Sequence, residues 1–332
     1  MGRKISPGAK YIHEVMDLFP NTPSLSLAKK IYKDNPAPFK SVESIRTIIR
    51  IRRGQHGDWR RKATADKSNF TKPGSTNPFN LPEPVDENFE PHYINDTRIL
   101  IISDLHFPYQ DNKAITAALK YGLEMKVNAI LINGDLIDFA AISRHERDWR
   151  QRMPHEEFEA ARQFLVGLRK AFPKANIVYK EGNHCERWMK WLFIKAPELF
   201  NDPEFRLDVR LRLGELKIQH VGDRRPVNIG KLTVLHGHET FGGSGGVNPA
   251  RSMFLKMIDN VLVGHFHRTS SHVERTAKMK VISVQSMGCL CTLNPYYMRY
   301  NKHNHGFVYV EHNFKTGEYY LHNKMIDNGK VY

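Results

Sequence analysis

Five short apolar runs, each followed at once by a polar segment rich in Asp, Asn or His, constrain the fold of this chain more than any other feature. The runs cover residues 99–102, 129–132, 177–179, 232–235 and 261–263. They are rich in Ile and Val and are separated by stretches with helical periodicity, which is typical of buried strands in a layered α/β core. Because sites in open α/β sheets form at the carboxyl edge of the strands, the five polar segments are expected to converge.

The polar segments carry the ligand types that divalent metal ions prefer. They read Asp104-Leu105-His106, Gly134-Asp135-Leu136-Ile137-Asp138, Gly182-Asn183-His184, His236-Gly237-His238 and Gly264-His265-Phe266-His267. Carboxylate, imidazole and amide oxygen suit Mn, Fe, Ni and Zn without any thiolate. The candidate ligands are too many for one ion and suit two, and a pair of metals roughly 3.5–4 Å apart can clamp a phosphoryl group.

The local spacing supports this interpretation. If the Asp104–His106 segment is extended, both side chains lie on one face. The glycines at 134, 182 and 264 precede candidate ligands and suit tight turns where backbone passes close to a bound group. A lone Asp-x-His is weak evidence in a chain with 17 histidines. The occurrence of all five segments in order, each after its own strand, favours a metal site.

The ordered set of motifs resembles the calcineurin-like metallophosphoesterase superfamily, over roughly residues 97–332. The resemblance implies an α/β fold in which a two-sheet β-sandwich is flanked by helices. It implies that one metal is bound by Asp104, His106 and His267, and the other by Asn183, His236 and His265, with Asp135 bridging the pair. It also implies that His184 is the catalytic histidine, oriented by Asp104.

This assignment predicts a metal-dependent phosphoric ester hydrolase. Two cations lower the pKa of a bridging water, which then attacks as hydroxide, and they neutralise charge on the phosphate. Protonated His184 would donate to the leaving oxygen. We expect two divalent ions, Mn first, with Fe, Ni or Zn also compatible. Two interpretations of Arg187 stay open, phosphate binding and a structural ion pair, and His238 is expected to be a supporting or core residue.

The positive charge is concentrated near the N-terminus. The net charge is +15, and residues 1–65 hold 14 lysines and arginines against 5 aspartates and glutamates. Such an excess is typical of polyanion binding. Apolar periodicity predicts helices over residues 8–19, from an N-cap at Ser24, and from an N-cap at Ser41. The third helix has Val42, Ile45, Ile48 and Ile49 on one side, and Arg46, Arg50 and Arg53 on the other.

Three short helices with a basic last helix look like a helix-turn-helix domain that binds nucleic acid. A solvated basic face and a protein-docking module are the alternatives. The predicted organisation is an all-α domain over residues 1–61, a Pro-rich linker over 62–96 and a catalytic domain over 97–332. Alternating runs near 272–276, 279–284, 306–312 and 317–322 are expected as antiparallel strands of the second sheet.

A glycine-rich loop follows the fourth motif. Backbone amides near Gly243 and Gly245 could approach phosphate, and Asn248 is expected to begin a helix; a tight turn is the alternative. Three cysteines without C-x-x-C spacing favour a reducing, cytoplasmic setting, and Cys289 and Cys291 are expected to serve packing. No apolar run reaches membrane-span length and no signal-peptide core is found, so we expect no membrane partner.

The substrate is less constrained than the metal site. Phe139 follows Asp138 where the resembling protein phosphatases have Arg, and Cys185 follows His184 where they have Glu. The closing motif is nearer to cyclic-nucleotide phosphodiesterases and repair nucleases, although Cys185 departs from those too. The leading hypothesis is a phosphodiesterase or nuclease to which the N-terminal module delivers nucleic acid. The alternative is a phosphoesterase for a small nucleotide or phosphoprotein with a protein-docking module, and a DNA-binding regulator with a vestigial site is disfavoured.

Overall fold

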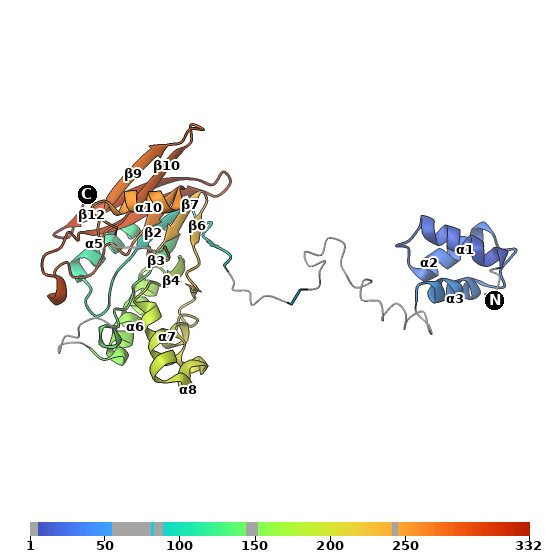
Figure 1. Ribbon diagram of the computed structural model, residues 1–332, viewed down its shortest axis with the longest axis horizontal. Helices are drawn as coiled ribbons and strands as arrows, with labels where there is room; N and C mark the ends of the chain where they lie inside the picture. The colour runs from blue at the N-terminus through green and yellow to red at the C-terminus, as the bar shows by residue number, and fades with distance from the viewer. Residues whose placement is uncertain (1–5, 55–80, 83–88, 144–151, 241–244) are drawn as a thin grey trace. The chain divides into compact units, whose positions relative to one another are not determined.

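A computed structural model describes residues 6–54, 81–82, 89–143, 152–240 and 245–332. The chain forms two compact units, Met1–Asp86 and Glu87–Tyr332 (Figure 1). None of the helices within the described ranges combines the length and apolarity that a membrane span requires.

The first unit contains three helices around a small apolar core. The helices are α1 (Pro7–Leu18), α2 (Ser24–Asp34) and α3 (Val42–Arg52). The core is made of Ile12, Leu27, Ala28, Ile31, Ile45 and Ile49, all fully buried. Ser41 caps α3 as predicted, since its side chain accepts a hydrogen bond from the Ser44 amide at 3.2 Å. The predicted cap at Ser24 is wrong: Ser24 is the first residue of α2, and its hydroxyl accepts a hydrogen bond from Arg53 at 3.0 Å.

The arginines on the predicted basic side of α3, Arg46, Arg50 and Arg53, are each partly buried. The exposed positions of this helix are Glu43, Thr47, Ile51 and Arg52. Arg46 pairs with Glu43 at 3.3 Å, and Arg53 also donates to the carbonyl of Pro20 at 3.1 Å. Arg46 and Arg53 therefore have partners within their own unit.

The second unit contains most of the chain's regular structure. Its strands are β1 (His92–Tyr93), β2 (Arg98–Ile102), β3 (Ala129–Asn133), β4 (Asn176–Lys180), β5 (Ile218–Val221), β6 (Val227–Ile229), β7 (Leu232–Leu235), β8 (Val261–Val263), β9 (Ser270–Arg275), β10 (Val281–Ser286), β11 (His305–Asn313), β12 (Glu318–Asp327) and β13 (Lys330–Val331). Its helices are α5 (Asn112–Glu124), α6 (Pro154–Ala171), α7 (Cys185–Lys195), α8 (Pro197–Phe200), α9 (Leu207–Arg210) and α10 (Pro249–Met257). Short 3-10 turns are η2 (Ala140–Ile142), η3 (Pro203–Phe205) and η4 (Tyr296–Met298).

The strands form two sheets. One sheet has the order β13-β12-β11-β2-β3-β4-β5, and the other has the order β1-β6-β7-β8-β10-β9. Strands β2 to β5 are parallel to one another, as are β7 and β8. The predicted assignment of all the late strands to the second sheet is therefore wrong for two of them. β11 and β12 extend the first sheet antiparallel to β2, because β11 pairs Val308 with Ile101.

Side-chain alternation along the strands builds four layers. In β2, Ile99 and Ile101 face the opposite sheet, whereas Leu100 and Ile102 face helices. Helices α5, α6 and α7 cover the outer face of the seven-stranded sheet, and α10 packs on β8, β9 and β10 of the other (Figure 1). This is the two-sheet sandwich flanked by helices that was predicted. β1, within the segment expected as linker, pairs in parallel with β6.

Candidate metal centre

The five predicted polar segments lie at the carboxyl ends of their strands and meet in space. Asp104 follows β2, Asp135 follows β3 and Asn183 follows β4, so the parallel first sheet brings them to one edge. His236 follows β7 and His265 follows β8 in the facing sheet. The site therefore lies where the carboxyl edges of both sheets come together, as the sequence predicted.

Asp135 is at the centre of the cluster. Its Oδ2 atom lies 3.2 Å from His236 Nε2, 3.8 Å from His106 Nε2 and 3.9 Å from His184 Nε2. Its Oδ1 atom accepts a hydrogen bond from the His184 amide at 2.9 Å. One carboxylate oxygen thus reaches imidazoles from both predicted ligand sets, which is the geometry that a bridging ligand requires.

Asp104 has an oxygen that protein donors leave unsatisfied. Its Oδ2 atom accepts hydrogen bonds from Ser103 Oγ at 2.6 Å and from the His265 amide at 3.0 Å. Its Oδ1 atom lies 3.2 Å from His267 Nε2, yet it accepts no well-formed hydrogen bond from the described residues. Since a fully buried carboxylate oxygen without a partner is costly, this position suits a cation.

The imidazoles direct the same nitrogen toward these carboxylates. His106 Nδ1 donates to Asp138 Oδ1 at 2.8 Å, and His236 Nδ1 donates to the carbonyl of Asn133 at 2.8 Å. Each ring therefore presents Nε2 to the cluster, which is the orientation that metal-binding histidines have when their other nitrogen is held by an acceptor. Among the described side chains, Asp135, His236 and His265 place ligand atoms within 4.8 Å of one another. Asn183 Oδ1 lies 3.2 Å from His236 Nε2.

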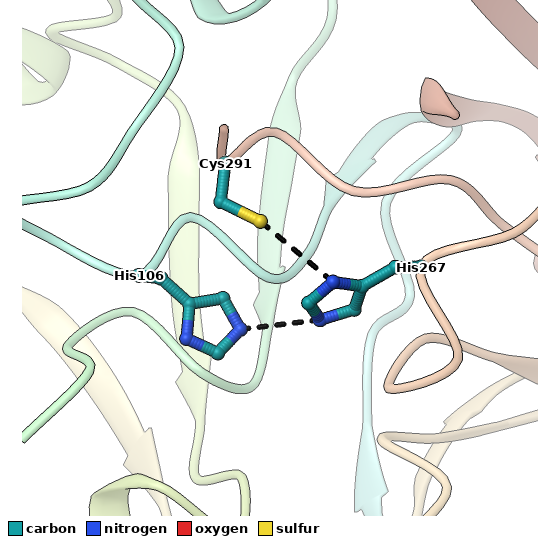
Figure 2. A group of neighbouring side chains, drawn as sticks. All are labelled: His106, His267 and Cys291. Carbon is teal, nitrogen blue, oxygen red and sulfur yellow. Dashed lines mark hydrogen bonds between the residues drawn. The ribbon is translucent and has the colours of Figure 1, made fainter. Parts of the chain in front are cut away.

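Cys291 joins this cluster, although the sequence assigned it only to packing. Figure 2 shows its sulfur directed at the ring of His267, and Sγ lies 3.7 Å from His267 Nδ1. The opposite nitrogen, Nε2 of His267, lies 3.2 Å from His106 Nε2. Cys291 thus contacts the Nδ1 side of His267, as Asp138 contacts the Nδ1 side of His106. No local pattern could reveal this contact, because Cys291 comes from a different loop of the chain.

The carboxylates strongly influence the protonation of the rings. Burial opposes a charge on His236, but Asp135 and Asp104 outweigh it and raise the pKa of His236 to about 9. For His265, burial and the neighbouring His236 lower the pKa to about 4. Burial alone would raise the pKa of Asp135, but His236 holds that pKa well below its usual range. The carboxylates attract positive charge here, and a bound metal ion would replace the proton on His236.

The structure corrects the expected support of His184. Its Nδ1 atom lies 2.9 Å from the Asp138 carbonyl oxygen and 3.0 Å from Asp138 Oδ1, so Asp138 and not Asp104 orients the ring. Arg187 donates to the same carbonyl at 2.9 Å, and its other terminal nitrogen lies 2.9 Å from His184 Nε2. Because a guanidinium can only donate, Nε2 accepts this hydrogen bond and the ring is neutral in this arrangement.

A buried ion pair supports the fourth motif. Lys180, fully buried at the end of β4, lies 2.8 Å from Glu239 Oε1. Glu239 in turn accepts hydrogen bonds from the His236 and Gly237 amides, at 2.9 and 2.6 Å. The other histidine of the fourth motif, His238, pairs with a different carboxylate: its Nε2 atom lies 2.8 Å from Glu186 Oε1. Local sequence patterns contain no sign of the Lys180–Glu239 pair, because Lys180 ends β4 in one sheet and Glu239 follows β7 in the other.

The backbone at several predicted ligands is left-handed, so the Asp104–His106 segment is not extended. Asp104, His106 and Asp135 have φ values of 55°, 51° and 46°. Non-glycine residues in this region are sparse and concentrate at functional sites. At Gly134 the backbone passes close to a predicted ligand, as expected, because a Cβ there would lie 2.1 Å from His236 Nδ1.

The glycine-rich loop is only partly described. Gly243 lies outside the described residues. Gly245 has a φ of 59°, and a Cβ there would lie 2.7 Å from Phe266. Asn248 caps α10 as predicted, because its side chain accepts from the Arg251 amide at 3.0 Å. The described part of the loop therefore packs on the fifth motif.

The sequence model for calcineurin-like phosphoesterases matches residues 97–302, which hold all five motifs. The chain belongs to this family. It is therefore a metal-dependent phosphoric ester hydrolase, and the His and Asp groups at the sheet edges could hold metal ions.

Related proteins extend this comparison. The "Gene 54 protein" of Mycobacterium phage L5 is 26% identical over 183 residues, covering 52% of this chain and 69% of that protein. The protein of the same name from Mycobacterium phage D29 matches to the same extent. Among solved structures, a single mutant of Vps29 from Entamoeba histolytica is 14% identical, with a TM-score of 0.37, covering 71% of this chain and 96% of that one. Yfce, a phosphoesterase from E. coli, is 14% identical with a TM-score of 0.34, covering 68% and 98%.

Gly134→Ala is expected to weaken metal binding by this phosphoesterase about 10- to 100-fold, because the added methyl group displaces His236. The measurement is bound Mn²⁺ per chain at equilibrium, beside a thermal unfolding curve. Gly167→Ala is the control, since a Cβ at that helical position meets no atom within 4 Å. The control should keep wild-type metal affinity and gain about 1 kcal/mol of stability. Wild-type affinity in a folded Gly134→Ala variant would contradict this account of the site.

Proposed function

We propose that this phosphoesterase hydrolyses phosphodiester bonds of nucleic acid at a pair of divalent cations, with Mn²⁺ the first ion to test. One cation would be bound by Asp104, His106 and His267, the other by Asn183, His236 and His265, and both by Asp135. The position of Asp135 Oδ2 carries this proposal, because it lies near His236 from one set and His106 from the other. When bound, such a pair activates water and neutralises phosphoryl oxygens.

His184 is proposed as the group that protonates the leaving oxygen. Its Nε2 atom faces the cluster, 3.9 Å from Asp135 Oδ2, while Asp138 fixes the opposite side of the ring. The ring can donate from Nε2 only after Arg187 leaves that atom and Nε2 takes up a proton from solvent. A phosphate group attracts a guanidinium more strongly than a neutral imidazole does, so substrate would draw Arg187 to a phosphoryl oxygen and free His184.

The charge distribution supports nucleic acid as the substrate. The chain carries a net charge of +15, and the excess is concentrated in residues 1–65. Phosphate backbones bind such surfaces through counterion release, which is independent of sequence. The three-helix unit would raise the local concentration of nucleic acid at the tethered catalytic unit.

A second candidate is a phosphoesterase for a small nucleotide or phosphoprotein, with the first unit docking a protein. The partners of Arg46 and Arg53 within the unit favour it, as do exposed apolar side chains there. Leu18 is 73% exposed, and Phe19, Leu25 and Ile51 are 42%, 41% and 43% exposed. Protein-docking surfaces often present such groups together.

Asp135→Asn is expected to abolish Mn²⁺-dependent cleavage, because removing a bridging charge leaves both cations weakly held. Cleavage of labelled single- and double-stranded DNA is measured beside metal content. Tyr320→Ala, a substitution on the exposed face of β12, is the control for nonspecific effects of substitution and should cleave as the wild type does. Full metal content and activity in Asp135→Asn would refute the bridging role. Activity of the wild type on a chromogenic ester without any DNA cleavage would favour the second candidate.

Removing residues 1–65 is expected to lower DNA affinity at least about tenfold at low salt and to flatten its salt dependence, since fewer phosphates are neutralised. Binding is measured over a salt series, with hydrolysis of a chromogenic ester as the control for an intact catalytic unit. Unchanged affinity and salt slope in an active truncated protein would show that the first unit does not deliver the nucleic acid.

A further inference from the structure

A tyrosine-rich loop lies beside the proposed metal centre. It runs from Cys291 to β11 and contains η4. Tyr296, Tyr297 and Tyr300 are 63%, 71% and 99% exposed. Single exposed aromatic rings are ordinary on protein surfaces, but three within five residues are a cluster, and exposed apolar clusters commonly mark binding sites. Because this loop lies beside the proposed metal centre, a substrate bound at the metals would contact it.

The loop forms one wall of a cavity that includes proposed metal ligands. The cavity has a volume of about 330 Å³, within the range of small-ligand sites. Its lining joins two groups of residues: His106, Asp138 and His267 from the metal centre, and Tyr109, Tyr296, Tyr297 and Arg299 from around the loop. A group bound against the tyrosines would therefore be adjacent to a phosphate bound at the metals.

Hydrogen bonds hold the loop in one shape. Asn301 Nδ2 donates to the carbonyls of Leu293 and Met298, at 2.6 and 2.8 Å. At the ends of the loop, the Thr292 amide donates to Tyr109 O and the Asn304 amide donates to His267 O, both at 2.9 Å. Both ends are thus fixed to backbone close to the metal centre. A wall organised before binding loses little conformational entropy when a ligand arrives.

The chemistry of this wall matches a nucleobase beside a phosphate. The Arg299 guanidinium lies 5.6 Å from the ring centre of Tyr296, and Arg299 also donates to the Asn294 carbonyl at 3.2 Å. Aromatic rings interleaved with cations are how proteins bind unpaired bases and their backbone.

Resting on the proposed function, we propose that Tyr296 and Tyr297 form a stacking platform for the base next to the scissile phosphodiester, so that the substrate is single-stranded nucleic acid. A base within a duplex has both faces covered by its neighbours and cannot stack on a side chain. An unpaired base has an open face of any sequence, so the platform favours single strands without selecting a base. Arg299 would bind the flanking phosphate.

The test uses the full chain and a single-stranded oligonucleotide containing the fluorescent base 2-aminopurine. Quenching of this base on binding in EDTA reports stacking independently of catalysis, and KM for Mn²⁺-dependent cleavage is measured separately. Tyr296→Ala and Tyr297→Ala are each expected to weaken single-strand binding and raise KM about 5- to 150-fold, and to abolish quenching at that base. Tyr297→Trp, which retains an aromatic ring at that position, should keep the quenching that Tyr297→Ala loses. Tyr320→Ala, equally exposed on β12 at 72%, should behave as wild type.

Each negative result has its own meaning. If the wild type cleaves single strands and both alanine variants keep wild-type KM and quenching, the platform is refuted while the proposed function stands. The same conclusion follows if duplex DNA shows an equal penalty for the substitutions, because duplex bases are already stacked. If the wild type cleaves no oligonucleotide but hydrolyses bis(p-nitrophenyl) phosphate, the nucleic-acid function fails and the platform fails with it.

Discussion

Two carboxylates buried side by side are the constraint on which the catalytic unit depends. Asp104 and Asp135 are 0% and 1% exposed. Each buried charge loses several kcal/mol of solvation, and the two repel each other, so the fold must supply positive charge between them. Histidines from both sheets do so, and the raised pKa of His236 reflects it. Cations bound by the same side chains would satisfy the constraint more completely.

The surrounding structure holds these groups against their repulsion. Parallel strands bring the ligand segments to one edge, and left-handed residues turn Asp104 and Asp135 inward. Asp138 contacts the rings of His106 and His184 and fixes the direction of both. Glu239, which is paired with Lys180, accepts a hydrogen bond from the backbone amide of His236. A ligand set supported in this way on rigid elements can bind metal ions without first reorganising.

Local sequence pattern predicted the strands and their polar ends, and the family resemblance implied the two-sheet sandwich. Local pattern did not predict contacts between distant segments. The support of His184 by Asp138, the approach of Cys291 to His267 and the pairing of β11 with β2 all require the folded chain. The arginines of α3 show the same limit, because helical periodicity places Arg53 on a face but cannot show that Ser24 binds it. The tyrosine loop has no periodicity at all, and only its position beside the metal centre gives it meaning.

The most direct test of the dinuclear centre is anomalous diffraction from crystals of the full chain soaked in Mn²⁺. We expect two peaks about 3.5–4 Å apart. Asp135 should lie between them, with Asp104, His106 and His267 around one and Asn183, His236 and His265 around the other. A single peak, or two peaks that do not share Asp135, would contradict the proposed centre.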